Sequence, residues 1–271
     1  MSAVQRVSLQ PAYLLHQRAY RDTSMILDVL TPEFGRIALV AKGVRQQKSK
    51  LKGVLRLFQP LVISWTSRGE MGSLTGAEAQ GRSLHMAPEV LPCGFYLNEL
   101  VLKLLHQHDP QIELFSDYDE TLRRLAAISI EHATLTQAQQ QKSIEVCLRH
   151  FEVSLLQAMG YALNIDRDFH THSTISSNSE YLYHFDAGPS LLSAHSESGA
   201  VEAGIAINGA ALLALSSRSL SLEHPDIIFQ QAKRLMRAIL DYYLGHKPLH
   251  SRQLLMGQRK MPGDIPEVQD D

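Results

Sequence analysis

The sequence predicts an α+β protein with two domains, a β-rich first domain and a mainly α-helical second domain. Short apolar segments separated by turn residues fill residues 1–80, whereas from residue 95 onward the apolar residues recur at three- and four-residue intervals. The charge changes as well: residues 1–82 contain 12 basic and 5 acidic side chains, and residues 83–271 contain 14 and 23. This difference predicts a nucleic-acid-binding domain joined to a domain with another role.

Five segments of the first domain have the composition of β-strands, being rich in Val, Ile, Leu and aromatic residues. These segments are 12–17, 24–30, 36–41, 61–65 and 71–77. Turn residues such as Thr31-Pro32 and Arg68-Gly69 separate them. Five strands within about 80 residues fit a small closed barrel, so we expect residues 1–80 to form a five-stranded oligonucleotide-binding (OB) fold.

One stretch of this expected barrel carries charge of a single sign. Between Phe34 and Gly69 there are eight Lys or Arg residues and no Asp or Glu. Such a stretch attracts polyanions, usually a nucleic-acid backbone, although a solvated basic loop without a partner is the alternative. Residues 43–53 connect the third and fourth strands, and alternating lysines there would share one side of an extended chain. The predicted DNA-binding residues are Arg36, Lys42, Arg45, Lys48, Lys50, Lys52 and Arg56.

Proteins that bind single strands usually add aromatic side chains on which the bases stack. The candidates in the first domain are Tyr20, Phe34, Phe58 and Trp65, and each of them also suits the barrel core. For Phe58 and Trp65 we expect the core position. A site dominated by charge does not need unstacked bases, so double-stranded DNA is an expected ligand as well.

The second domain is expected to span residues 81–256 and to be mainly helical. The predicted helices are 95–106, 114–128, 143–159, 207–215 and 225–243. Residues 164–200 are the least helical part, with one strand-like segment at 181–185. The tail, residues 257–271, is rich in turn residues and ends in two Asp residues, so we expect it to be disordered.

Several classes of protein are excluded by what the sequence lacks. Cys93 and Cys147 are the only cysteines, too few for a disulfide framework or a zinc site of several thiolates. Phosphate-loop, dinucleotide-binding, HExxH and GxSxG motifs are absent, so we expect no enzyme and no cofactor. The N-terminus lacks the apolar core of a signal peptide, and no apolar run approaches the roughly 18 residues of a membrane span. We therefore expect a cytoplasmic protein without a membrane segment.

One segment of the second domain has the composition of a peptide-binding groove. Arg149 stands beside the apolar residues Leu148, Phe151 and Leu155. An Arg next to an apolar groove can bind a peptide carboxylate while an aromatic anchor of the peptide fills the groove. The alternative is a helix-surface Arg paired with a glutamate of the same helix.

Six segments along the chain form an ordered set of motifs. They are YRDTS (20–24), LVAKGVR (39–45), YLNEL (96–100), LRHFE (148–152), GY (160–161) and KPLHSRQL (247–254). In their residues and their order they resemble the bacterial RecO family of recombination mediators. The sequence resembles this family over residues 7–256, and the tail beyond lies outside the resemblance.

The resemblance implies a DNA repair protein without enzymatic activity, built from an OB domain and a helical domain. Members of the family bind single- and double-stranded DNA and anneal complementary strands. With RecR, and in a functional link to RecF, they help to load RecA onto DNA coated by single-strand DNA-binding protein (SSB), whose acidic C-terminal tail they recognise. The resemblance implies that Arg149 contacts this tail and that the protein is cytoplasmic and nucleoid-associated. The alternative is an RNA-binding OB protein that acts in RNA or ribosome maturation.

The sequence departs from the family at one point. Many members carry a four-cysteine zinc site soon after the Gly-Tyr pair, but the corresponding stretch, residues 166–184, contains no cysteine. We therefore expect no zinc and a lobe held by packing alone, since two imidazoles do not make a structural zinc centre. An enzyme with a metal on His170, His172 and His184 is a third alternative, although no carboxylate or thiol cluster accompanies these histidines.

Overall fold

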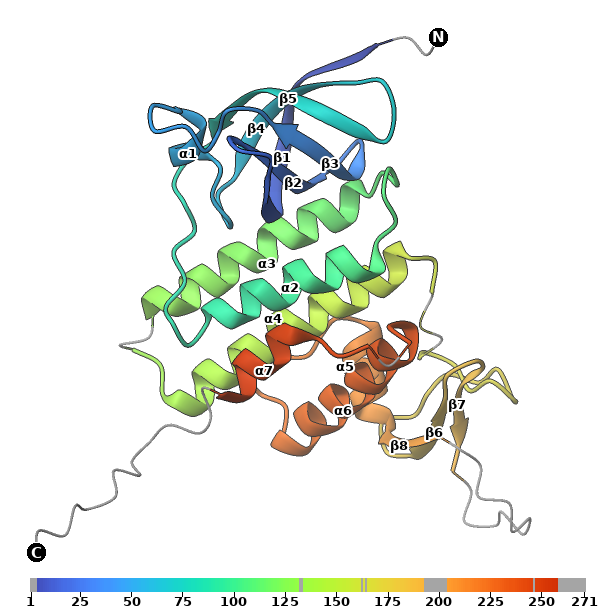
Figure 1. Cartoon of the computed structure of the whole chain (residues 1–271). Helices are drawn as coiled ribbons and strands as arrows, with labels where there is room; N and C mark the ends of the chain where they lie inside the picture. Colours follow the sequence, from blue (N-terminus) through green and yellow to red (C-terminus); the bar gives the residue numbers. More distant parts are fainter. Residues whose placement is uncertain are drawn as a thin grey trace, which may run out of the picture.

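The computed structural model confirms an N-terminal barrel followed by a mainly helical region (Figure 1). In Figure 1 the barrel lies at the top, the helices of residues 91–158 form the layer beneath it, and the later helices with a small sheet lie below that layer. The described residues are 4–131, 134–161, 163, 165–192, 204–245 and 247–257. Residues 258–271, nearly all of the tail predicted to be disordered, lie outside them.

Five strands close the barrel in the order typical of an OB fold. They are β1 (Gln5–Tyr20), β2 (Ser24–Thr31), β3 (Gly35–Ala41), β4 (Leu61–Ser67) and β5 (Met71–Ala79), with the short helix α1 (Leu51–Val54) between β3 and β4. The order around the barrel is β1-β2-β3-β5-β4, and the neighbours are antiparallel except for β3 and β5. Strand β1 extends beyond the predicted segment 12–17 at both ends, because its first half pairs with β4 and its second half with β2.

Strands β1 and β2 contribute to two cores at once. On β1, Ala12 and Leu14 belong to the barrel core, whereas Tyr13 and Leu15 pack into the core of the helical region. On β2, Leu30 also packs into the helical core. A strand that is covered on both faces is apolar at successive positions, which explains why these segments do not alternate between apolar and polar residues.

The barrel and the helical region meet at a tightly packed junction. The hydroxyl of Tyr13 donates a hydrogen bond to Asp119 of the helical region, and its ring packs edge-on against Tyr118 at 5.2 Å between centroids. The backbone at Gly35, with φ of +61°, approaches Asp109 so closely that a Cβ atom would lie 2.0 Å from the Asp109 carbonyl oxygen. Only glycine fits this approach, so a side chain at position 35 would force the two parts away from each other.

Six further helices lie in the described part of the chain. They are α2 (Leu91–Leu104), α3 (Ile112–Ile130), α4 (Gln137–Ala158), α5 (Gly209–Ser216), α6 (Asp226–Tyr243) and α7 (His250–Gly257). Helix α4 begins at a capping box formed by Thr136 and Gln139. The spacing of apolar residues did not predict α7, which is only eight residues long.

The predicted helix over 207–215 begins later than expected, because its first residues belong to a strand. Asn208 ends this strand in an extended conformation, and its side chain accepts a hydrogen bond from the backbone N–H of Ala210, so Asn208 is the N-cap of α5. The strand-like segment predicted at 181–185 is confirmed as the centre of the same small sheet. The sheet has the order β7-β6-β8, with β6 (Glu180–His184), β7 (Gly188–Leu191) and β8 (Ile205–Asn208).

The stretch 166–184, for which we expected packing alone, is also held by a buried carboxylate. Asp168 accepts hydrogen bonds from the backbone N–H groups of His170 and Thr171 at 2.9 and 2.8 Å. Its other oxygen accepts one from the backbone N–H of Leu191 at 2.6 Å. Burial on its own raises the pKa of a carboxyl group, but these hydrogen bonds lower the pKa of Asp168 below its ordinary value. The charged Asp168 therefore ties the loop to β7.

Candidate nucleic-acid interface

The basic loop between β3 and β4 folds as turns and a short helix. Turns fill most of residues 42–50, with Gly43 at φ of +68°, and α1 follows. The prediction that Lys48, Lys50 and Lys52 share one side of an extended chain is therefore wrong, because Lys52 lies in α1 and the other two precede it in the turns. All three side chains are nevertheless exposed.

Five cations of this loop are exposed and make no ion pair with any described residue. They are Lys42, Lys48, Lys50, Lys52 and Arg56. A cation that the protein itself does not neutralise can replace the counterions condensed on a nucleic-acid backbone. The loop can therefore supply affinity for phosphates that does not depend on base sequence.

The loop is fastened to the turn between β1 and β2. The backbone N–H of Arg45 donates a hydrogen bond to the Thr23 carbonyl at 2.9 Å, and its guanidinium donates one to the Arg21 carbonyl at 3.3 Å. The Arg21 guanidinium lies 5.1 Å from the centre of the Tyr20 ring. Arg21 is thus a further exposed cation at this end of the barrel. The sequence prediction missed it because Arg21 lies outside the acid-free stretch and next to Asp22.

A pocket of about 460 Å³ opens between the barrel and the loop that carries α1. Three of the predicted DNA-binding cations and five uncharged residues line it. The cations are Arg45, Lys52 and Arg56, and the uncharged residues are Gln17, Met25, Val44, Leu55 and Leu57. The cations are exposed, whereas Val44 and Leu55 are buried. The pocket therefore combines exposed cations with apolar side chains that are buried or half-buried.

Two of the four candidate stacking residues, Tyr20 and Phe34, remain partly accessible. Phe58 and Trp65 are buried, as predicted for core residues, and Phe34 packs edge-on against Trp65 at 5.0 Å between centroids. Tyr20 is half-buried beside Arg21. The exposed surface of this part of the barrel is therefore rich in cations and poor in aromatic rings.

Arg36 lies at the junction and not among the exposed cations with which it was predicted. Its Nε donates a hydrogen bond to the Leu105 carbonyl at 3.1 Å, and its Nη1 lies 4.0 Å from the Asp28 carboxylate. Its own carbonyl accepts a hydrogen bond from the backbone N–H of His108 at 3.0 Å. Burial lowers the pKa of Arg36, and the charge of Asp28 offsets part of this effect. Arg36 therefore stabilises the contact between barrel and helical region.

The residues predicted to bind a peptide do not line an open groove. Leu148, Arg149, Phe151 and Leu155 of α4 are 5%, 5%, 1% and 0% exposed. Helices α2, α3, α5 and α6 all contact α4, so its apolar residues fill the core of the helical region. The spacing that suggested a groove is the spacing of a helix that is covered on most of its surface.

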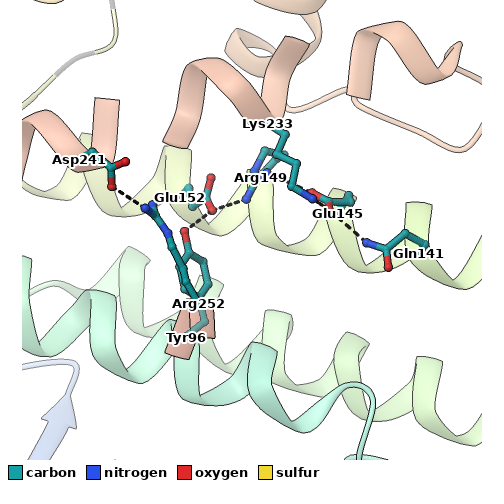
Figure 2. A network of polar contacts seen from close by, with 8 residues as sticks. All are labelled: Tyr96, Gln141, Glu145, Arg149, Glu152, Lys233, Asp241 and Arg252. Atoms are coloured by element: carbon teal, nitrogen blue, oxygen red, sulfur yellow. Dashed lines mark hydrogen bonds and ion pairs between the residues drawn. The ribbon is translucent and has the colours of Figure 1, made fainter. Parts of the chain in front are cut away.

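Arg149 belongs to a buried polar network that joins α2, α4 and α6 (Figure 2). Its guanidinium donates a 3.1 Å hydrogen bond to Glu145 and also pairs with Glu152. Glu152 in turn accepts a 2.7 Å hydrogen bond from the Tyr96 hydroxyl, and Glu145 pairs with Lys233. Burial on its own lowers the pKa of an arginine, but the two carboxylates raise the pKa of Arg149 above its ordinary value. Arg149 is therefore a charged structural residue of the interior.

Helix α7 is attached to α2 by one carboxylate. Glu99 accepts hydrogen bonds from the backbone N–H groups of His250 and Ser251 at 3.0 and 2.8 Å, and from the Ser251 hydroxyl at 2.6 Å. Lys103 lies 2.9 Å from Glu99 and donates to the Pro248 carbonyl at 2.7 Å. Partial burial on its own raises the pKa of Glu99, but these hydrogen bonds lower it from 4.5 to about 2. The YLNEL segment therefore caps the helix formed by the KPLHSRQL segment.

Acidification is expected to weaken the attachment of α7. Because the pKa of Glu99 is about 2 in the folded protein and 4.5 ordinarily, its contribution is complete above pH 4.5 and is lost as the pH falls toward 2. Hydrogen-exchange protection of residues 249–255 should therefore decrease over this pH range. The variant Glu99→Gln should show low protection already at neutral pH. Equal protection of this variant and the unchanged protein at neutral pH would contradict the capping role.

The histidine-rich region brings together no metal-binding group in the described parts of the chain, where no three His, Cys, Asp or Glu side chains are grouped to hold an ion. His170 and His184 contact the ring of Phe169 at 3.7 and 5.8 Å between centroids. The Nε2 atom of His184 lies 3.0 Å from the Ser190 hydroxyl.

Among the helices that the structure describes, none has the length and apolar composition to cross a bilayer.

The chain matches two family models, Recombination protein O N terminal over residues 5–81 and Recombination protein O C terminal over residues 85–253. It is 42% identical over 257 residues to the DNA repair protein RecO of Nitrosococcus oceani, which covers 94% of this chain and 96% of that protein. It is 40% identical over 251 residues to the DNA repair protein RecO of Nitrosospira multiformis, with 93% and 96% covered. The barrel and the helical region each match one model, so the chain belongs to the RecO family of DNA repair proteins.

Proposed function

We propose that this chain binds single- and double-stranded DNA through the cations of its barrel and acts in DNA repair without making or breaking a covalent bond. The observation that carries the proposal is the group of exposed cations on the β3–β4 loop that make no ion pair with described residues. They are Lys42, Lys48, Lys50, Lys52 and Arg56. Neutralising phosphates releases counterions, and single and double strands both offer phosphates, so both should bind.

The proposal extends to annealing and to the loading of RecA. Two strands with neutralised phosphates repel each other less, and strands held on one protein have a high effective concentration, so complementary strands should anneal faster. Membership of the RecO family supports the finer role: with RecR, and in a functional link to RecF, the protein would help RecA to replace SSB on DNA at the nucleoid of the cytoplasm.

The helical region is the proposed binding partner of SSB's acidic tail. To reach Arg149, this tail would have to displace the carboxylates of Glu145 and Glu152, and the neighbouring Leu148, Phe151 and Leu155 are buried. We therefore propose a tail site elsewhere on the helical region, with Arg149 holding the helices that carry it.

Salt dependence tests the DNA-binding proposal. Affinity for a short single-stranded oligonucleotide should fall steeply between about 50 and 200 mM salt, and the slope of log affinity against log salt gives the number of phosphates neutralised. An affinity that stays constant over this range would contradict the proposal. Competition with RNA of the same length and base sequence distinguishes a DNA-binding protein from an RNA-binding OB protein. An RNA that displaces the DNA at much lower concentration would favour a role in RNA maturation.

A further inference from the structure

We propose that the pocket between the barrel and the α1 loop holds an unpaired base of single-stranded DNA, while the cations around it bind the adjacent phosphates. The inference rests on the proposed function, DNA binding at the barrel, and adds a subsite to it. Exposed cations attract both forms of DNA. A base-binding pocket would give the same surface a means of distinguishing a single strand from a duplex.

The size and apolar lining of the pocket suit a base. Its volume of about 460 Å³ lies within the range of roughly 300 to 1,000 Å³ in which proteins bury small ligands. Four of its lining residues are apolar, namely Met25, Val44, Leu55 and Leu57. Val44 and Leu55 are 2% and 5% exposed, so the half-buried Met25 and Leu57 supply most of the accessible apolar surface. The thioether of Met25 adds a favourable contact with an aromatic ring such as a base.

The polar lining suits the edge of a base and the phosphates beside it. The half-buried amide of Gln17 makes no hydrogen bond with any described residue, and an amide offers both donors and an acceptor. It can therefore pair with the edge of different bases. Arg45, Lys52 and Arg56 line the same pocket and are exposed, so their charge complements the phosphates on either side of an inserted base.

Pairing decides whether a base can reach this pocket. In a duplex the edges and faces of each base are occupied by its partner and its neighbours, and taking one base out costs a few kcal/mol. In a single strand the bases are free to contact protein. The pocket should therefore add affinity for single strands alone, on top of the phosphate contacts that both forms share.

An oligonucleotide that lacks its central bases tests the inference with the unchanged protein. Two single strands of equal length are compared, one with all its bases and one with tetrahydrofuran abasic units at its central positions. The abasic strand should bind at least about fivefold more weakly, with the same salt slope, because its phosphates are unchanged. Equal affinities would overturn the base pocket and leave the proposed function standing. Binding of both strands without any salt dependence would overturn the proposed function instead.

A variant of the pocket lining tests the same inference by changing the protein and leaving the DNA unchanged. Met25→Ala removes an apolar wall without changing charge and should weaken single-strand binding about fivefold while duplex affinity stays the same. Met71→Ala is the matched control, because Met71 is 46% exposed on β5 and does not line the pocket. The fluorescence of Trp65, the only tryptophan, reports whether the barrel remains folded. If folded Met25→Ala weakens single-strand and duplex binding equally, the inference is overturned. If Met25→Ala does not fold, the comparison of the intact and abasic strands on the unchanged protein is the deciding test.

Discussion

Replacing Lys48, Lys50 and Lys52 together by Gln should weaken single-stranded DNA binding by about 100-fold or more near 50 mM salt. The three side chains are exposed and make no ion pair with described residues, so the change should remove the proposed phosphate contacts and leave the fold intact. Each phosphate contact contributes about 0.7 to the salt slope on a single strand, so the slope should fall by about 2. Fluorescence anisotropy of a labelled oligonucleotide at several salt concentrations measures both quantities.

The control for this variant lies on the helical region. Arg237 and Lys247 are exposed cations there, and replacing both by Gln should leave DNA affinity nearly unchanged. Circular dichroism and the fluorescence of Trp65 should match the unchanged protein in both variants. If the lysine variant keeps the full salt slope, the β3–β4 loop does not contact phosphates. If both variants weaken binding alike, the protein attracts DNA by its overall field and has no local site.

Arg149→Met should destabilise the protein by about 3–5 kcal/mol. The change leaves Glu152, which is 0% exposed, with the Tyr96 hydroxyl on one oxygen and no hydrogen-bond partner on the other. An unpaired buried carboxylate is costly because the interior solvates charge poorly. Urea unfolding followed by far-UV circular dichroism measures the loss, which should appear as a lower midpoint.

Two further variants separate this account from a binding role. Adding Glu152→Gln to Arg149→Met removes the unpaired charge and should recover part of the lost stability. Arg124→Met breaks an ion pair with Glu120 whose side chains are 52% and 58% exposed, so it should cost less than about 1 kcal/mol. A variant Arg149→Met with full stability and no affinity for an SSB-tail peptide would restore Arg149 as a peptide contact.

The order of strands and helices was predictable because most elements carry their own local pattern. Strand β2 and helix α6 occur within two residues of their predicted bounds, 24–30 and 225–243. Elements that depend on distant partners were not predictable. Helix α7 is short, and the side chain that caps it, Glu99, lies 151 residues before His250. Strand β8 exists because it pairs with β6, and its apolar residues alone do not distinguish a strand from the start of a helix.

The sequence predicted which cations the candidate site contains, but not which of them remain exposed and unpaired in the folded protein. The acid-free stretch shows that cations are present, but it does not show which of them the protein itself neutralises. Arg36 is paired with Asp28 of the neighbouring strand, and Arg149 is enclosed by Glu145 and Glu152 of its own helix. The pairing of Arg149 was an alternative in the sequence analysis because Glu145 and Glu152 lie within four residues of it. Its burial was not predictable, because it results from the packing of four other helices around α4.

The close approach of Gly35 to Asp109 fixes the orientation of the barrel relative to the helical region. A barrel joined by a flexible tether would present DNA at every angle, and only the tether's length would matter. Here the backbones of barrel and helical region touch, and Tyr13 and Arg36 bridge them. Under the proposed function, a strand bound along the β3–β4 loop would therefore keep one angle to a protein bound on the helices. The 5′ and 3′ ends of that strand would then differ for such a protein, and the rigid junction would give the complex a polarity along DNA.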